Sequence, residues 1–258
     1  MMESILIKKE EQSVMLRQGT GRPPIIIMNP EKVIAVVSGG LDSTTMLYHI
    51  IEQGYHPIVL TFHYGQKHKL EIEYAQATCD KLGLEHHVIS IPALPGSSLT
   101  DKDVEVPKED YSVETQKLTV VPNRNMVFLS VAASYAIAYG CKWIFYAAHH
   151  NDEAVYPDCT RAFVDNMNMT LNVATYKMPQ IDAPFIDKTK AEIVKIGHEL
   201  GVPFEDTWSC YDPVEVTVSK DAVAFSKEMA HCGVCGTCRE RKNAFEESNV
   251  EDPTIYNR

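Results

Sequence analysis

The chain has 258 residues, 45% of them hydrophobic, which fits a globular protein with a full core and excludes a disordered or fibrous chain. Its formal net charge of -11 disfavours a large nucleic-acid surface, because binding to a phosphate backbone needs clustered Lys and Arg. No apolar run reaches the roughly 18 residues of a membrane-spanning helix, and the initial MMESILIKKEEQ lacks the apolar segment of a signal peptide, so we expect a cytoplasmic protein with no membrane partner.

Residues 1–32 precede the first strand that we expect in the main fold. They contain the breaker-rich run Gly19-Thr20-Gly21-Arg22-Pro23-Pro24, which is typical of turns. We interpret this part as an N-terminal extension that forms a β-hairpin or packs on a neighbour, with disorder as the open alternative.

A strand, a glycine turn and a helix are predicted next, in that order. The apolar run KVIAVV (32–37) leads into SGGLDSTT (38–45), and the apolar residues 46, 47, 50 and 51 have helical spacing. Asp42 and Ser43 are suited to cap this helix, whose N-terminus carries unpaired N–H groups and about half a positive charge. The turn is therefore suited to a phosphate, although it matches neither G-x-x-x-x-G-K-S/T nor G-x-G-x-x-G.

The stretch SGGLDS resembles the pyrophosphate loop of the ATP-pyrophosphatase superfamily, also called the PP-loop superfamily. The resemblance implies that ATP binds here with its β- and γ-phosphates held as the leaving group, so that AMP is transferred. A plain glycine turn before a capped helix is the alternative. The residues assigned to ATP are Val37, Ser38, Gly39, Gly40, Leu41, Asp42, Ser43, Thr44, Thr45, Met46 and Leu47.

Strands and helices alternate after this loop. A strand is predicted at 58–62, a helix at 68–82 that Gly83 ends, and a strand at 87–91. The βαβαβ rhythm predicts an α/β fold with a doubly wound parallel sheet, in which ligands gather at the carboxyl ends of the strands. The long loop 92–121 is a substrate lid or a surface decoration.

The sequence PNRN (122–125) opens a predicted helix over 126–139 that is apolar nearly all round and therefore buried. Arg124, in this opening, needs an anionic partner. A strand over 143–148 leads to His149-His150-Asn151-Asp152-Glu153, for which a metal site and a solvated or substrate-contacting loop are both open. The loop is favoured because adjacent side chains diverge.

A helix at 161–174 and a short strand near 180–183 precede a capping box formed by Thr189 and Glu192. Lys190 lies in the first turn of the helix that follows, where the helix dipole disfavours a cation. A bound phosphate would compensate this charge, and an exposed surface lysine is the alternative.

The cysteines near the C-terminus have the spacing of a metal site. Cys232, Cys235 and Cys238 form two overlapping C-x-x-C steps, and Cys210 can supply a fourth thiolate. Such a set suits a tetrahedral structural Zn²⁺, with an iron–sulfur cluster as the rival. Cys79 and Cys141 are predicted core residues.

Seven motifs together resemble the 7-cyano-7-deazaguanine synthase (QueC) family over residues 33 to about 247. They are SGGLDSTT, FHYGQKH, PNRN, YPDC, KAE at 190–192, WSCY and CGVCGTC. The resemblance implies an ATP-dependent carbon–nitrogen ligase that converts 7-carboxy-7-deazaguanine and ammonia into the nitrile, a precursor of queuosine and archaeosine. It also implies a homodimer, and the adenine nucleotide alpha hydrolase variant of the Rossmann-like fold.

The chemistry implied by this family needs activation, since a carboxylate has a poor leaving group. Adenylation supplies AMP as a good one, ammonia gives the amide, and a second ATP allows loss of AMP to the nitrile. Loop N–H groups, Mg²⁺ and Lys190 would neutralise the phosphates, so that Lys190, Asp42 and Ser43 are the catalytic candidates.

The candidates for the deazaguanine substrate are Tyr64, Gln66, His68, Arg124 and Asp158. Asp158 is suited to accept the N–H donors of a guanine-like edge, and Arg124 to bind the substrate carboxylate.

Three parts are therefore expected: the extension at 1–32, a PP-loop domain at 33–205 and a zinc module with a C-terminal helix at 206–258. The chain departs from the family pattern at His63 and Thr160 and in the long stretch 211–231. These departures leave open a ligase that joins the same acid to another amine, including one on a protein, or that stops at the amide. A nucleotide-binding module without turnover is a third alternative, and tRNA thiolation is disfavoured by the acidic charge.

Overall fold

Five short strands form a parallel sheet in the order β5-β4-β3-β6-β7 in the computed structural model of the chain. The structure describes residues 13–16, 25–28, 30–67, 69–101, 103–104, 117–152, 155–176, 178–219 and 225–257. The strands are β3 (Glu31–Val36), β4 (Tyr55–His63), β5 (His86–Ser90), β6 (Trp143–Phe145) and β7 (Gln180–Asp182). The strand order reverses between β3 and β6, so a ligand site is expected beside the carboxyl ends of these two strands.

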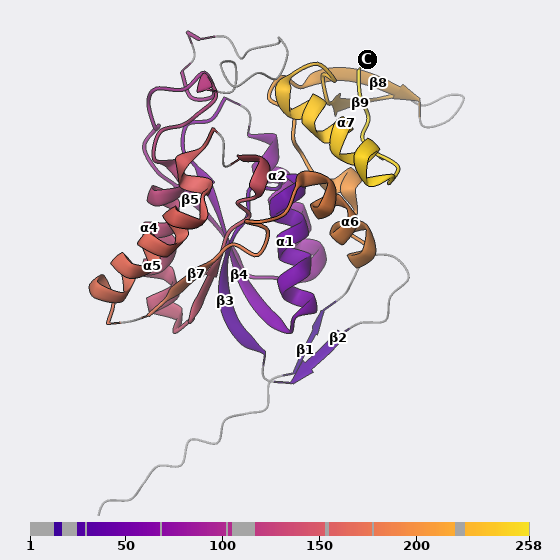
Figure 1. Cartoon of the computed structure of the whole chain (residues 1–258). Coiled ribbons are helices and arrows are strands. Elements are labelled where there is room, and N and C mark those ends of the chain that lie inside the picture. The colour runs from indigo at the N-terminus through magenta and orange to yellow at the C-terminus, as the bar shows by residue number, and fades with distance from the viewer. Residues whose placement is uncertain are drawn as a thin grey trace, which may run out of the picture.

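Helices cover both faces of the sheet (Figure 1). One face carries α1 (Leu41–Glu52), α2 (Leu70–Leu82), α6 (Lys190–Leu200) and α7 (Gly236–Ser248), and the other carries α4 (Arg124–Tyr139) and α5 (Arg161–Ala174). Strand β3 alternates between them, because Val33 and Ala35 are buried in one core and Ile34 in the other. The predicted doubly wound α/β fold is confirmed.

Two hairpins lie outside this sheet. Strands β1 (Ser13–Leu16) and β2 (Ile25–Met28) pair antiparallel, which confirms the β-hairpin expected within residues 1–32. Strands β8 (Val214–Ser219) and β9 (Phe225–Ala230) form a second hairpin between Cys210 and Cys232. The short 3-10 helices are η1 (His150–Asp152), η2 (Pro157–Cys159) and η3 (Phe204–Asp206).

The predicted capping of α1 by Asp42 and Ser43 is wrong. The N-cap residue is Gly40, and no side chain caps the helix. Ser43 is the third residue of the helix, and its Oγ donates to the Gly40 carbonyl at 3.2 Å and accepts from the Ser38 N–H at 3.1 Å. The Thr189–Glu192 capping box is confirmed at α6, with both reciprocal hydrogen bonds present.

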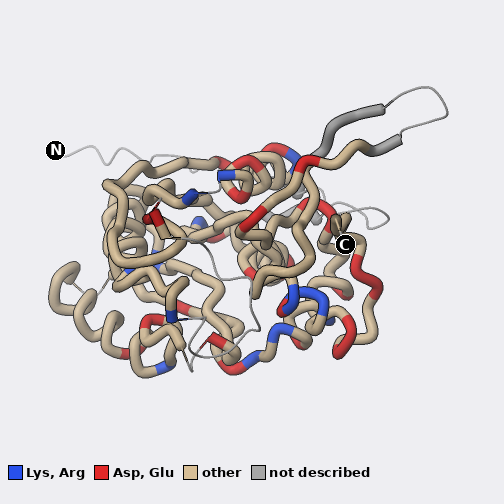
Figure 2. Tube along the Cα trace, turned by 90° about the horizontal axis from the view of Figure 1, so that it is seen from above, with Lys and Arg blue, Asp and Glu red and all other residues tan. Residues whose placement is uncertain are grey.

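Several element bounds differ from the prediction by one to three residues. Helix α4 begins at Arg124, and β6 ends at Phe145, where a strand to 148 was expected. Seen from above (Figure 2), Lys and Arg are interspersed with Asp and Glu. Within the described ranges, no helix combines the length and the apolar character needed to cross a bilayer.

Candidate functional site

A cavity of about 250 Å³ opens at the carboxyl ends of the central strands. Two groups of side chains line it. The loop cluster consists of Asp42, His149, Asp152, Lys190 and Glu240. The Arg124 cluster consists of Phe62, Tyr64, Gln66, Glu71 and Arg124.

The glycine turn packs tightly against neighbouring backbone. Gly39 has φ +92°, and a Cβ there would lie 2.0 Å from the Glu71 carbonyl oxygen. Its own carbonyl accepts from the Trp208 N–H at 2.9 Å. Glycine is therefore required at 39 for contact with α2, whereas Gly40 is the glycine that lines the cavity.

The residues assigned to ATP fall into two sets. Those that line the cavity are Val37, Ser38, Gly40, Leu41, Asp42 and Ser43. Those that do not are Gly39, Thr44, Thr45, Met46 and Leu47. Residues 44–47 are fully buried in α1, where they support the turn from behind.

Lys190 lies between two carboxylates of the loop cluster. Its Nζ is 2.6 Å from Glu240 Oε2 and 3.2 Å from Asp42 Oδ2. The residue is only 9% exposed, so the alternative of an exposed surface lysine is wrong. The two acids balance a cation that the dipole of α6 disfavours. Nothing in the sequence indicated Glu240, which α7 brings to the site from the far end of the chain.

Asp42 and Asp152 have opposite electrostatic environments. Burial acts to raise the pKa of Asp42, but Lys190 and His149 outweigh it and hold that pKa below its ordinary value. Burial raises the pKa of Asp152 although His149 opposes this. Asp42 Oδ1 is buried and has no hydrogen-bond partner among the described residues, and a carboxylate oxygen of this kind suits a hard cation such as Mg²⁺.

The adjacent residues His149 and His150 differ in exposure, as expected for neighbouring side chains in a loop. His149 is 2% exposed, and its Nε2 lies 3.5 Å from Asp152 Oδ2 and 3.8 Å from Asp42 Oδ2. His150 begins η1 and is exposed. His149 and Asp152 therefore line the cavity. The sequence had left open whether this loop is solvated, contacts the substrate or binds a metal.

The Arg124 cluster is held by a chain of hydrogen bonds. Gln66 Oε1 accepts from the Tyr64 N–H at 2.8 Å, and Gln66 Nε2 donates to Glu71 Oε1 at 3.1 Å. Arg124 donates through NH1 to the Tyr64 hydroxyl at 3.4 Å. Tyr64, Gln66 and Arg124 were candidates from the sequence. Glu71 was not, because a first-turn glutamate is ordinary in any helix.

Asp158 and His68 have different outcomes. Asp158 is not among the residues that line the cavity. Its Oδ2 accepts from the Asn125 N–H at 2.9 Å, so it caps α4, whose own N-cap residue Asn123 makes no side-chain cap. His68 lies outside the described residues.

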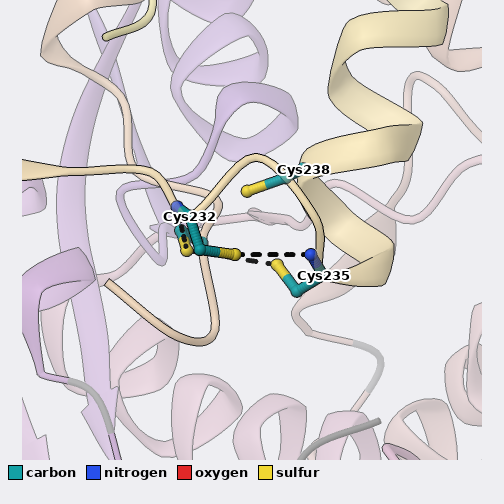
Figure 3. A group of neighbouring side chains, drawn as sticks. Cys232, Cys235 and Cys238 are labelled. Carbon is teal, nitrogen blue, oxygen red and sulfur yellow. Dashed lines mark hydrogen bonds between the residues drawn. The ribbon is translucent and has the colours of Figure 1, made fainter. Parts of the chain in front are cut away.

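The four late cysteines converge, and Figure 3 labels three of them, Cys232, Cys235 and Cys238. The sulfurs of Cys210, Cys232, Cys235 and Cys238 all lie within 4.8 Å of one another and are buried. Backbone N–H groups of Cys232 and Asp212 donate to Cys210 Sγ at 3.2 and 3.3 Å, which stabilises thiolates. A zinc ion with Zn–S bonds of about 2.3 Å requires sulfurs roughly 3.8 Å apart, and Cys210 and Cys235 are 4.0 Å apart. These residues fit a bound metal ion.

Comparison with known proteins gives consistent matches. The family model described as "Queuosine biosynthesis protein QueC" matches residues 32–249. The 7-cyano-7-deazaguanine synthase of Methanoregula boonei is 45% identical over 228 residues, which cover 87% of this chain and 99% of that protein. The enzyme of the same name from Archaeoglobus fulgidus is 42% identical over 229 residues, 87% of this chain and 90% of its own. A solved structure of the U34-tRNA thiolase NcsA from Methanococcus maripaludis is more distant, with 17% identity, a TM-score of 0.47 and coverage of 73% of this chain and 63% of that one.

Proposed function

The chain belongs to the QueC family, and we propose that it is an ATP-dependent ligase that converts 7-carboxy-7-deazaguanine and ammonia into 7-cyano-7-deazaguanine. The observation that carries the proposal is the cavity itself. It joins a glycine turn and a buried lysine to a second cluster of polar and aromatic side chains within one site. A reaction between a nucleotide and a heteroaromatic acid needs such a pairing.

The loop cluster supplies the groups that adenylation requires. The first turn of α1 directs its amide dipoles toward the cavity, and Lys190 adds a positive charge beside them. When ATP binds, its phosphates replace Glu240 and Asp42 as partners of Lys190. The pyrophosphate is then held as the leaving group, and the α-phosphate faces the substrate carboxylate.

The second cluster positions the acid. Tyr64 and Gln66 are buried, and hydrogen bonds hold both of them and Arg124 in place before the substrate arrives. Substrate binding therefore costs little side-chain conformational entropy. Attack of the carboxylate on the α-phosphate gives the adenylate, and ammonia then gives the amide. Adenylation of the amide oxygen and loss of AMP complete the nitrile.

We assign Mg²⁺ to Asp42, whose buried Oδ1 is available, and Zn²⁺ to the four cysteines. Mg²⁺ would neutralise the phosphates of ATP, and zinc would stabilise the C-terminal module. Close packing of the four sulfurs favours a single ion over an iron–sulfur cluster, because the irons and sulfides of a cluster must themselves fit between the cysteines.

The test is to incubate the purified full chain with ATP, Mg²⁺, 7-carboxy-7-deazaguanine and ammonium, and to follow the base by mass spectrometry beside AMP release. We expect the nitrile with two AMP per product. AMP release that yields only the adenylate, the amide or a conjugate would replace the synthase by the ligase alternative. That alternative is not favoured, since a relative that shares 45% identity over 228 residues carries the synthase name.

The homodimer stays a prediction from the family. Sedimentation velocity of the full chain tests it, and the expected result is a single species of twice the 29.0 kDa chain mass. The division into parts at 33–205 and 206–258 likewise stays a prediction.

A further inference from the structure

Glu71 places a carboxylate in the wall of the cavity at the start of α2. Gln66, which is 6% exposed, holds Glu71 Oε1 in position and is itself fixed by the Tyr64 N–H and the Phe62 carbonyl. Burial raises the pKa of Glu71, and Arg124 and Gln66 offset only part of this effect. A buried carboxylate of this kind lowers the folding stability of the chain. Its presence in the cavity wall therefore indicates a role in ligand binding.

Arg124 places a guanidinium in the same wall. Its hydrogen-bond contact to a described side chain is the long one of 3.4 Å to the Tyr64 hydroxyl. No ion pair joins Arg124 to Glu71 in the described part of the chain. The positive charge of Arg124 nevertheless acts to lower the pKa of Glu71. The two carboxylate oxygens of Glu71 and the N–H donors of Arg124 therefore line the same cavity without an ion pair between them among the described residues.

A 7-deazaguanine base presents the complementary pattern on one edge. O6 is an acceptor, and N1–H and the 2-amino group are donors. We propose that Glu71 and Arg124 together read this edge, with the Glu71 carboxylate accepting from N1–H and the 2-amino group and Arg124 donating to O6. The inference rests on the proposed function and names the groups that select its substrate.

This assignment differs from two roles predicted from the sequence. Asp158, expected to accept the base donors, already caps α4 through the Asn125 N–H. Arg124, expected to bind the substrate carboxylate, is assigned to O6 in this proposal. The carboxylate at position 7 can then face the loop cluster, where adenylation takes place.

The same pair excludes adenine from the base site. Adenine carries an acceptor at N1 and an amino group where guanine has O6, so its edge would set a lone pair against Glu71 and a donor against Arg124. Sites built around hydrogen bonds reject analogues that leave buried polar groups unpaired far more strongly than apolar pockets reject a missing methylene. ATP is therefore kept out of the subsite meant for the acid.

The test compares 7-carboxy-7-deazaguanine with its analogue that lacks the 2-amino group. For the wild-type chain we expect kcat/KM to be about 100-fold higher for 7-carboxy-7-deazaguanine than for the analogue without the 2-amino group. In Glu71→Gln the amide offers one acceptor in place of two and sets its NH₂ against the base donors. The preference should fall below about 10-fold and the KM for the acid should rise at least about 10-fold, with the KM for ATP unchanged.

Two matched variants serve as controls. Glu73→Gln changes an exposed glutamate on the same helix, and Asp158→Asn tests the role predicted from the sequence. Both should keep the wild-type preference. Calorimetric titration of the acid without ATP measures recognition apart from turnover. A Glu71→Gln chain that keeps the preference, or a preference lost in Asp158→Asn, would overturn the inference. A wild-type chain that forms no nitrile but still binds 7-carboxy-7-deazaguanine more tightly than the analogue without the 2-amino group would overturn the proposed function alone.

Discussion

Lys190 is the cation that pairs with Asp42 and Glu240 in the loop cluster. We expect Lys190→Ala to lower AMP release by about 100-fold or more, because the charge that develops on the phosphates loses its nearest counter-charge. Steady-state assays of AMP measure this. The exposed Lys195 on the same helix provides the control, and Lys195→Ala should behave as wild type.

Removal of Lys190 also leaves Asp42 and Glu240 facing each other as like charges, so Tm should fall. The double variant Lys190→Ala with Glu240→Gln should regain most of that Tm without regaining activity. If activity returns with stability, Lys190 acts only through folding.

Glu71 gives a stability prediction with a defined sign. Its pKa in the folded chain lies above the ordinary value of 4.5, so at pH values between the unfolded and the folded pKa the folded chain keeps a proton that the unfolded chain has lost. Stability therefore falls as pH rises through the window above 4.5. Glu71→Gln should have a higher Tm than wild type at pH 7, and the difference should vanish below about pH 4. Thermal melts across this range measure it, and an equal or lower Tm at pH 7 would contradict the burial cost.

At the scale of elements, the cysteine module supports the active site from two sides. Trp208, two residues before Cys210, donates its backbone N–H to Gly39 in the turn. Glu240, two residues after Cys238, reaches Lys190 from α7. The segments that carry the four cysteines thus contact both the glycine turn and Lys190.

Removal of the metal by a chelator should therefore disturb the turn. Trp208 is 4% exposed, and its ring centroid lies 4.3 Å from that of His231, so its fluorescence reports on the module. In a Trp143→Phe background, where Trp208 is the single tryptophan, we expect a red-shifted emission together with lost AMP release. Zinc added back should restore both. An unchanged emission after complete loss of metal would show that the module does not depend on the ion.

The glycine turn gives a matched pair of variants. Gly39→Ala puts a Cβ 2.0 Å from the Glu71 carbonyl oxygen at φ +92°, whereas Gly83→Ala at φ +67° meets nothing within 4 Å. Gly83→Ala should cost about 1 kcal/mol from the left-handed backbone alone. Gly39→Ala should cost at least about 3 kcal/mol, since α1 and α2 must also separate. Urea unfolding measures both, and equal costs would refute the close approach.

At the scale of the whole molecule, charge separates a small-molecule enzyme from a tRNA-binding one. The net charge is -11, and Lys and Arg are interspersed with Asp and Glu in the view of Figure 2. We expect no mobility shift of bulk tRNA at physiological salt, because release of counterions needs clustered cations. A salt-dependent shift at micromolar protein would instead point to an RNA substrate.

Local signals were sufficient for most of the elements. Hydrophobic spacing placed the helix at 161–174 with the bounds of α5, and Thr189 and Glu192 identified the capping box of α6. These signals depend on residues three or four apart, whose contacts the backbone determines by itself. The caps of α1 and α4 were not predictable in this way, since one has no side-chain cap and the other is completed by Asp158 from another element.

The sequence by itself determined the α/β fold, the glycine turn, the cluster of four cysteines and the resemblance to the QueC family. Each depends on residue type and spacing along the chain. Only the tertiary structure decided that Glu71 and Arg124 share a wall, that Glu240 pairs with Lys190 and that Asp158 caps a helix. The physical reason is that packing of α2, α4 and α7 around one sheet brings together groups that are 33 to 53 residues apart in the chain, and no local pattern encodes that proximity.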